Sequence, residues 1–303
     1  MSAFPRALFI ANPGARQVSS QPDLPGQAQR CLAGHGIEAD LLITGGPGEA
    51  QHMARRAATQ GYDLVVAAGG DGTVNEVVNG LAGSDTALGL IPLGTGNVLG
   101  SYLGLPAGDL EAACRLIAEG ALRTIDLGCA NGRHFVTMAG CGLDAQVAAD
   151  TDSMWKSWLG KLAFVGQFME TLAWLRPWPY RATIDGRTLD GRMWAVFICN
   201  TAQYAWRVRL VPEAREDDGE LDIVILRDCR RDELQREANA VFFAGEPARS
   251  QPHMDVFRGR EVLVRCEPPA PWQVDGEVLG TTPLRCTVEP QMLKLVAPAK
   301  ARP

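Results

Sequence analysis

The sequence lacks the features that mark several large classes of protein. It has no lysine-containing phosphate loop of the GKS or GKT type, and no two cysteines stand in CxxC spacing. No stretch offers the roughly 18 uninterrupted apolar residues that a membrane-spanning helix requires. The N-terminal apolar run is too short for the core of a signal peptide, and Pro13 stops it. These absences predict a cytoplasmic protein.

Cysteine, histidine and net charge limit the function further. Eight cysteines and four histidines are scattered over 303 residues without a close Cys/His cluster. Such scatter is typical of reduced, mostly buried thiols, so we expect neither a disulfide framework nor a zinc site. The net charge of −6 argues against nucleic acid as a partner. The chain is long enough for two domains.

The first 125 residues alternate between short apolar runs and amphipathic segments. The apolar runs predict strands buried on both faces, at 7–12, 39–44, 63–68 and 88–93. The segments between them end at glycine and predict helices, as does 109–120. Fully apolar strands separated by helices predict a parallel sheet covered on both sides, an α/β domain of the Rossmann-like class.

The pattern changes after residue 125. Up to about residue 290, period-two runs with turns between them predict an antiparallel β domain; they include HFVTMAG, RATIDG, MWAVFICN, LDIVIL, EVLVRC and LRCTVE. A long helical pattern at about 154–175 interrupts them. The run 291–298 predicts a last strand that could pair in either domain. We therefore assign domains to 1–125 and 126–290, with 291–303 able to rejoin the first.

Glycine-bearing loops follow the four predicted strands of the first domain. They are 12–14, 44–46, 69–73 and 94–97. Open parallel sheets bind ligands at the carboxyl ends of their strands, and bare backbone N–H groups at a helix start attract anions. Thr73 and Thr95 could add hydroxyl donors. Any one loop could merely turn a corner, but four at one edge indicate a phosphate site.

No lysine follows these loops, so the charge of a bound phosphate must be met by backbone amides and Mg²⁺. Asp71 is the carboxylate best placed to engage that metal or a substrate hydroxyl. It could instead cap a helix that begins near Thr73. Near the other end of the chain, Asp275-Gly276 between alternating runs is, on its own, a typical hairpin turn.

GGDGTVNEVVNG and PLGTGNVLG are followed along the chain by RTIDLG, AGCGLDAQV, PEAREDDGELDIVIL and WQVDGEVL. This series resembles the catalytic domain of the diacylglycerol kinase and sphingosine kinase superfamily, in its small bacterial branch, over nearly the whole chain. GGDGT alone is weakly specific, because NAD kinases and phosphofructokinases use a similar loop. The resemblance implies an α/β domain followed by a β-sandwich, with ATP enclosed in the cleft between them.

The resemblance further implies an ATP- and Mg²⁺-dependent kinase that phosphorylates a membrane lipid hydroxyl, with diacylglycerol as the default substrate. Glu277 or Asp275 would accept the proton of that hydroxyl, and Asp126 would join Asp71 in a water-and-Mg²⁺ network. The nucleotide would contact the edge of the first domain at Asn12, Thr44, Gly69, Gly70, Asp71, Gly72, Thr73, Asn75, Gly94, Thr95 and Asn97.

Two positions depart from the family pattern. A structural Mg²⁺ would lie at the DDG turn, held by the Asp218 carboxylate, the carbonyl of Glu220 and a group at Arg215. An arginine can serve as a ligand there only through its carbonyl. Val98 stands where diacylglycerol-type relatives commonly have an aspartate. A sphingoid base or ceramide is therefore a rival substrate.

The segment 154–180 holds four of the seven tryptophans. Tryptophan beside basic residues favours a surface that contacts anionic lipid, so we expect peripheral association with the inner face of the membrane. The same side chains could instead pack against the β domain and a neighbouring subunit of a homodimer. Two rival functions stay open: an NAD kinase, in which Asp275–Glu277 would have no obvious role, and a nucleotide-binding regulatory module without catalysis.

Overall fold

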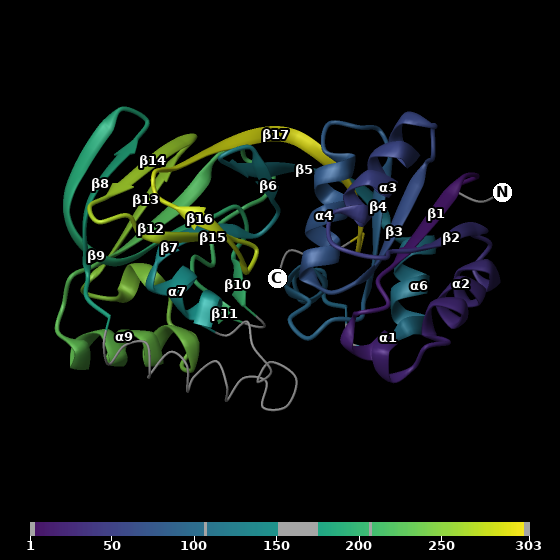
Figure 1. Cartoon of the computed structure of the whole chain (residues 1–303), viewed down its shortest axis with the longest axis horizontal. Coiled ribbons are helices and arrows are strands. Elements are labelled where there is room, and N and C mark those ends of the chain that lie inside the picture. The colour runs from purple at the N-terminus through teal and green to yellow at the C-terminus, as the bar shows by residue number, and fades with distance from the viewer. Residues whose placement is uncertain (1–3, 106–107, 151–174, 206–207, 300–303) are drawn as a thin grey trace. The chain divides into compact units, whose positions relative to one another are not determined.

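The computed structural model describes residues 4–105, 108–150, 175–205 and 208–299, whose elements are traced in Figure 1. The chain divides into two compact units, one of Met1–Asp126 with Pro290–Pro303 and one of Leu127–Glu289. We call them unit 1 and unit 2. The chain passes from one to the other within β5 (Ala121–Ala130) and β17 (Leu284–Ala297).

Unit 1 is built on a parallel sheet in the order β2-β1-β3-β4-β17. Its first four strands are β1 (Ala7–Ala11), β2 (Ala39–Ile43), β3 (Leu64–Gly69) and β4 (Ala87–Pro92). Every residue of β1, β3 and β4 is buried. The predicted α/β domain with strands apolar on both faces is confirmed for these three.

Helices cover both faces of this sheet. The chain leaves β1 in one direction to reach β2 and then returns past β1 to β3. Right-handed crossovers therefore place α2 on one face of the sheet and α3 and α4 on the other face. In agreement, α2 (Leu24–Gly34) packs against α6 (Leu110–Glu119), and α3 (Glu49–Thr59) packs against α4 (Asp71–Leu81) (Figure 1). The short helices α1 (Arg16–Ser20) and α5 (Val98–Tyr102) follow β1 and β4.

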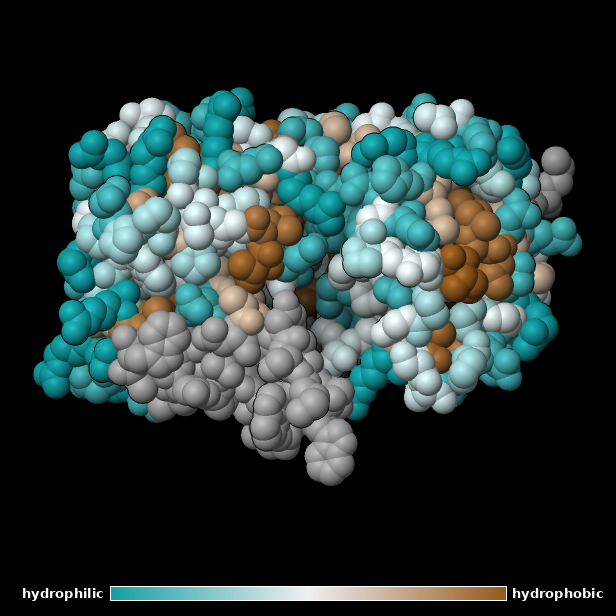
Figure 2. Space-filling model, in the orientation of Figure 1, coloured by the Kyte–Doolittle hydropathy of each residue, from teal (hydrophilic) through white to brown (hydrophobic). Residues whose placement is uncertain are grey.

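The prediction that 39–44 is buried on both faces is wrong. β2 lies at the edge of the sheet, and its Leu42 and Ile43 are 40% and 47% exposed. An apolar run identifies a strand, but it does not say whether the strand is central or at an edge, where helices cover less of it. Figure 2 shows hydrophobic side chains gathered on the visible face of unit 1.

Unit 2 is an antiparallel β-sandwich, as predicted. Besides parts of β5 and β17, the elements that the structure describes in unit 2 are β6 (Arg133–Phe135), β7 (Met138–Gly142), α7 (Leu143–Asp150), β8 (Trp178–Ile184), β9 (Arg187–Cys199), β10 (Gln203–Ala205), β11 (Val208–Arg209), β12 (Leu221–Arg227), α9 (Arg231–Phe242), η1 (Ala248–Ser250), β13 (Met254–Gly259), β14 (Glu261–Cys266), β15 (Pro271–Val274) and β16 (Glu277–Thr281). The strands run in the order β16-β15-β7-β9-β8-β14-β17, and β12 pairs with both β9 and β13.

The predicted aromatic helix at 154–175 falls outside the described residues except for its last residue, Leu175, which is buried. Its expected contact with membrane or with a second subunit therefore stays a prediction. None of the helices that the structure describes combines the length and the apolar character that crossing a membrane would need.

Strand β17 pairs in both units. Residues 284–287 run antiparallel to β14, whereas Lys294 and Leu295 run parallel to β4. The strand predicted at 291–298 is thus the end of a longer strand, and this end adds a fifth strand to the sheet of unit 1.

Gly80 marks the closest approach of α3 and α4. A Cβ atom there would lie 2.5 Å from the carbonyl oxygen of Gln51 and 2.7 Å from the Cβ of Ala54. Glycine-to-alanine changes inside helices ordinarily stabilise by about 1 kcal/mol, but this one would push two helices apart. We expect Gly80→Ala to lower the free energy of unfolding in urea by about 1–3 kcal/mol.

Gly34→Ala is the matched control, because the described atoms leave its added Cβ without a neighbour within 4 Å. It should be neutral or stabilising. A stabilising Gly80→Ala would contradict the close packing of the two helices.

Candidate active site

The carboxyl ends of β1 to β4 meet along one edge of the parallel sheet, and each loop there contacts the next. Thr44 N donates a hydrogen bond of 2.9 Å to the carbonyl of Ala11 at the end of β1. Asn12 Nδ2 donates to Thr73 Oγ1 at 2.9 Å, which joins the first loop to the third. A Cβ on Gly94 would lie 2.4 Å from the Cα of Gly70, so the third and fourth loops touch through backbone. The four predicted loops are therefore neighbours.

The bond between Asn12 and Thr73 spans the point where the strand order reverses. Strands β1 and β3 are adjacent in the sheet, but the chain moves away from them in opposite directions. Open α/β sheets bind ligands at such a point. Asn12 Oδ1 also accepts from Gly14 N at 2.8 Å, so both ends of the amide are held.

Helix α4 starts at this edge. It begins at Asp71 with Gly70 as its N-cap residue, two residues before the predicted start. Val74 N donates to the carbonyl of Gly70, and the backbone N–H groups of residues 71–73 lie before this first turn of the helix closes. Gly72 is exposed, and a Cβ there would meet no described atom within 4 Å. A helix start with this open face can receive an anion on its backbone amides.

The Asp71 carboxylate caps α5. It accepts from Asn97 N at 2.8 Å and from Val98 N at 2.7 Å. A Cβ on Gly96 would approach Asp71 Oδ2 to 2.4 Å, which explains the second glycine of that loop. Val98 contributes its backbone N–H to this contact. A metal at Asp71 stays a prediction.

Three more predicted residues take their positions in unit 1. Asn97 has a left-handed backbone (φ 49°), and its side chain bonds both N and O of Gly94, which leaves Thr95 exposed at the tip of a closed loop. Asn75 is buried in α4. Asp126 is buried at the end of unit 1 and accepts from Gln291 N at 2.8 Å. Its part in a metal network stays a prediction.

In unit 2, Asp275 and Gly276 form the two-residue turn between β15 and β16. Both have positive φ, 46° and 89°, as a type I′ hairpin requires. The Asp275 carboxylate accepts from three backbone N–H groups, those of Val136, Thr137 and Met138, at 3.0–3.1 Å. The Thr137 hydroxyl is a fourth donor. These donors make Asp275 the anchor of the hairpin.

Glu277 differs from Asp275 although only two positions separate them. It is the first residue of β16, its side chain is 54% exposed, and its Oε2 lies 3.7 Å from Arg133 Nη2. A general base must be reachable by the hydroxyl it deprotonates. Of these two carboxylates, Glu277 is the one that a substrate hydroxyl could reach, and the role of base stays a prediction.

No role was predicted from the sequence for Asp144, which lies in the run AGCGLDAQV. It lies in the first turn of α7 and accepts from Tyr204 Oη and, at 2.7 Å, from Gln273 Nε2. Gln273 Oε1 accepts from Gly276 N at 2.7 Å, which connects α7 to the hairpin of Glu277. Burial raises the pKa of the Asp144 carboxyl. The sequence signal that could have identified Asp144 is its position inside a largely apolar run.

Asp144 and Tyr204 also contribute to the lining of a small apolar cavity in unit 2. Its volume is about 20 Å³, room for about one water molecule. It lies among α7, β9, β12 and α9, and its other lining residues are Leu143, Val147, Phe197, Leu210, Leu226, Leu234, Ala238, Val241, Phe242 and Met254.

An arginine occupies the surroundings of the predicted structural metal. Arg258 stands opposite Asp222 in the β12–β13 register. Its guanidinium pairs with Asp218, with Glu220 at 3.2 Å and with Asp222 at 3.4 Å. The side chain of Arg215 pairs with a neighbouring aspartate at 3.3 Å. Arg258 thus supplies positive charge to these carboxylates, and Mg²⁺ at this turn stays a prediction.

Family descriptions match both units. Residues 6–130 match the diacylglycerol kinase catalytic domain, and residues 137–297 match the YegS C-terminal NAD kinase beta sandwich-like domain. The chain is 34% identical over 280 residues to a diacylglycerol kinase of Bacillus subtilis, covering 92% of this chain and 91% of that one. It is 36% identical over 231 residues to a diacylglycerol kinase of Staphylococcus aureus, covering 76% and 73%.

Solved structures show the same architecture. A crystal structure of a diacylglycerol kinase from Bacillus anthracis superimposes with a TM-score of 0.76 and 22% identity over 99% of both chains, which supports the fold. Another structure from the same organism superimposes with a TM-score of 0.82 at 25% identity, again over 99% of both chains.

The raised pKa of Asp144 predicts how stability depends on pH. The pKa of an aspartate in an unfolded chain is about 3.9. A carboxyl whose pKa is raised by folding contributes stability fully below that value, and the contribution is lost as the pH rises through the folded pKa. Relative to wild type, Asp144→Asn should therefore gain stability as the pH rises from about 4 to 8 in thermal melts.

The exposed Asp190, which pairs with Arg181, offers the control Asp190→Asn. Its stability difference from wild type should change less over the same range. Parallel profiles of Asp144→Asn and wild type would contradict the effect of burial.

Proposed function

The chain belongs to the diacylglycerol kinase family and is a lipid kinase, and we propose that it transfers the γ-phosphate of ATP to the hydroxyl of diacylglycerol with the help of Mg²⁺. The observation that carries this proposal is the 34% sequence identity with the Bacillus subtilis diacylglycerol kinase, over an alignment that covers 92% of this chain. Sphingoid bases and ceramide are the alternative acceptors.

Unit 1 has the properties that a triphosphate site needs. The amides of residues 71–73 and the open face at Gly72 offer hydrogen-bond donors at a helix start. Asp71 and Asp126 are the carboxylates that would hold Mg²⁺, directly or through water. In phosphoryl transfer the metal neutralises charge on the phosphates. The protein's own task is to position the triphosphate and keep the loops of the sheet edge in place.

Unit 2 has one property that a lipid acceptor needs. Glu277 offers a reachable carboxylate for the hydroxyl proton. Val98 lacks the carboxylate that diacylglycerol-type relatives commonly have there, so a sphingoid base or ceramide stays an alternative acceptor. Since diacylglycerol resides in the membrane, we also propose peripheral binding to the inner membrane face.

The direct test is incubation of the full chain with γ-labelled ATP, Mg²⁺ and mixed micelles that contain diacylglycerol, sphingosine or ceramide. Chromatography should find the label in phosphatidic acid. Label found only in sphingosine phosphate or ceramide phosphate would show that the acceptor is a sphingoid base or ceramide and not diacylglycerol. A parallel reaction with NAD in place of lipid tests the rival, since labelled NADP without labelled lipid would overturn the proposal.

ATP affinity should depend on Gly72. A valine there adds a branched side chain on the open face of the helix start, where the described atoms leave room for it. We expect Gly72→Val to fold normally and to bind ATP at least about tenfold more weakly in calorimetry, a loss of about 1.4 kcal/mol.

Gly34→Val is the control for Gly72→Val, because it adds the same side chain at another open helical position of unit 1. Unchanged ATP affinity in Gly72→Val would show that the phosphates of ATP do not bind at this loop.

Glu277→Gln should affect catalysis, whereas Asp275→Asn should affect stability. Loss of the reachable carboxylate should lower kcat by about 10²-fold or more while the melting temperature stays near wild type. Asp275→Asn removes the charge of the carboxylate that accepts four hydrogen bonds and turns one of its oxygens into an NH₂ donor, so it should lower the melting temperature. Both are measured with the diacylglycerol assay and thermal melts.

Glu261→Gln is the control for Glu277→Gln. Glu261 is also an exposed glutamate of unit 2 that pairs with an arginine, Arg285. It should keep wild-type kcat. Full activity in Glu277→Gln would exclude Glu277 as the base.

A further inference from the structure

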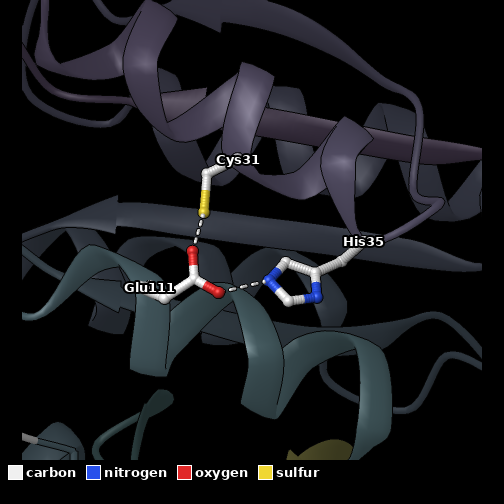
Figure 3. A group of neighbouring side chains, drawn as sticks. All are labelled: Cys31, His35 and Glu111. Atoms are coloured by element: carbon white, nitrogen blue, oxygen red, sulfur yellow. Dashed lines mark hydrogen bonds and ion pairs between the residues drawn. The ribbon is translucent and has the colours of Figure 1, made fainter.

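Three side chains of different chemistry meet on the surface of unit 1, between α2 and α6 (Figure 3). Cys31 and His35 stand four residues apart at the end of α2 and so lie on one side of the helix. Glu111 is in the first turn of α6. One carboxylate oxygen lies 3.3 Å from Cys31 Sγ and the other lies 2.9 Å from His35 Nε2.

We propose that Cys31, His35 and Glu111 form a binding site for Zn²⁺ that fastens α2 to α6. Thiolate, imidazole and carboxylate are the ligand types of zinc, whereas Mg²⁺ and Ca²⁺ prefer oxygen alone. The three ligand atoms all lie within 4.8 Å of one another. Tetrahedral zinc, with bonds of about 2.0–2.3 Å, separates its ligand atoms by about 3.4–3.6 Å. Small side-chain shifts therefore suffice.

The surroundings suit a bound ion. The His35 and Glu111 side chains are 22% and 64% exposed, so an ion can enter from solvent and a water can complete the fourth position. Behind them, Cys114 Sγ of α6 donates to the carbonyl of Ala28 of α2 at 3.8 Å, a further contact between the two helices that the ion would fasten.

The scattered cysteines and histidines predicted no zinc site, whereas the folded chain brings three zinc-type ligands together. Cys-x₃-His is a close spacing only on a helix, where positions four apart are neighbours. The third ligand lies 76 positions from His35 in the sequence and is brought near by the packing of α2 on α6. Neither fact is visible in a scan for CxxC pairs.

A second cluster in unit 2 provides an internal comparison. Cys129 and His134 face each other in the β5–β6 register, and Glu289 lies 3.0 Å from His134 Nε2. It contains the same residue types in a different setting, on strands. Variants of this cluster therefore report whether any Cys/His/Glu group binds the metal or whether the helical one does.

The test is a zinc titration of the full, reduced chain by competition with a coloured chelator. Cys31→Ser, His35→Gln and Glu111→Gln should each weaken Zn²⁺ binding by more than about 100-fold, since even outer-shell changes commonly cost 10–100-fold. Co²⁺ in place of Zn²⁺ should give a thiolate charge-transfer absorption that Cys31→Ser removes. Zn²⁺ should raise the melting temperature of wild type but not of the three variants.

Cys129→Ser and His134→Gln should bind Zn²⁺ like wild type. Circular dichroism without metal checks that each variant is folded. Unchanged affinity in Cys31→Ser and His35→Gln, or loss of binding in Cys129→Ser instead, would overturn the proposal. A cobalt complex without thiolate absorption would do the same.

Discussion

The edge of unit 1 where the four glycine-bearing loops meet depends on one carboxylate. Asp71 begins α4 and at the same time accepts the two backbone N–H groups that open α5. Hydrogen bonds from amides to a charged oxygen are stronger than neutral ones, and a helix start adds favourable charge. This contact holds the third loop against the fourth and explains why Gly94 and Gly96 have no room for a side chain. It also fixes the direction in which the remaining lone pairs of Asp71 point.

The order of the secondary structure was predictable because it follows from local pattern. Apolar runs alternating with amphipathic segments could only build a covered parallel sheet, and the carboxyl ends of its strands had to lie at one edge. The position of β2 was not predictable in this way. Its apolar residues are the same types as those of β3, and only the strand order, which is a property of the whole sheet, leaves Leu42 and Ile43 exposed.

The candidate site was predictable as a set of residues but not as a set of roles. Asp275 and Glu277 are close in sequence, yet one is surrounded by backbone donors from the start of β7 and the other faces solvent. Arg258 could not be connected with Asp218 before the β12–β13 register was known. Asp144 meets Gln273 across 129 positions of sequence. Long-range pairing decides each of these cases, and residue type does not.

Strand β17 has a consequence for the order in which the chain acquires structure. The parallel sheet of unit 1 takes its fifth strand from residues near the end of the sequence, through Lys294 and Leu295 beside β4. During synthesis the other four strands emerge first, and the whole of unit 2 is made before the fifth becomes available. Until then one edge of β4 carries unpaired N–H and C=O groups, a liability in any nascent sheet. Unit 1 comes first in the chain, but its sheet is completed last.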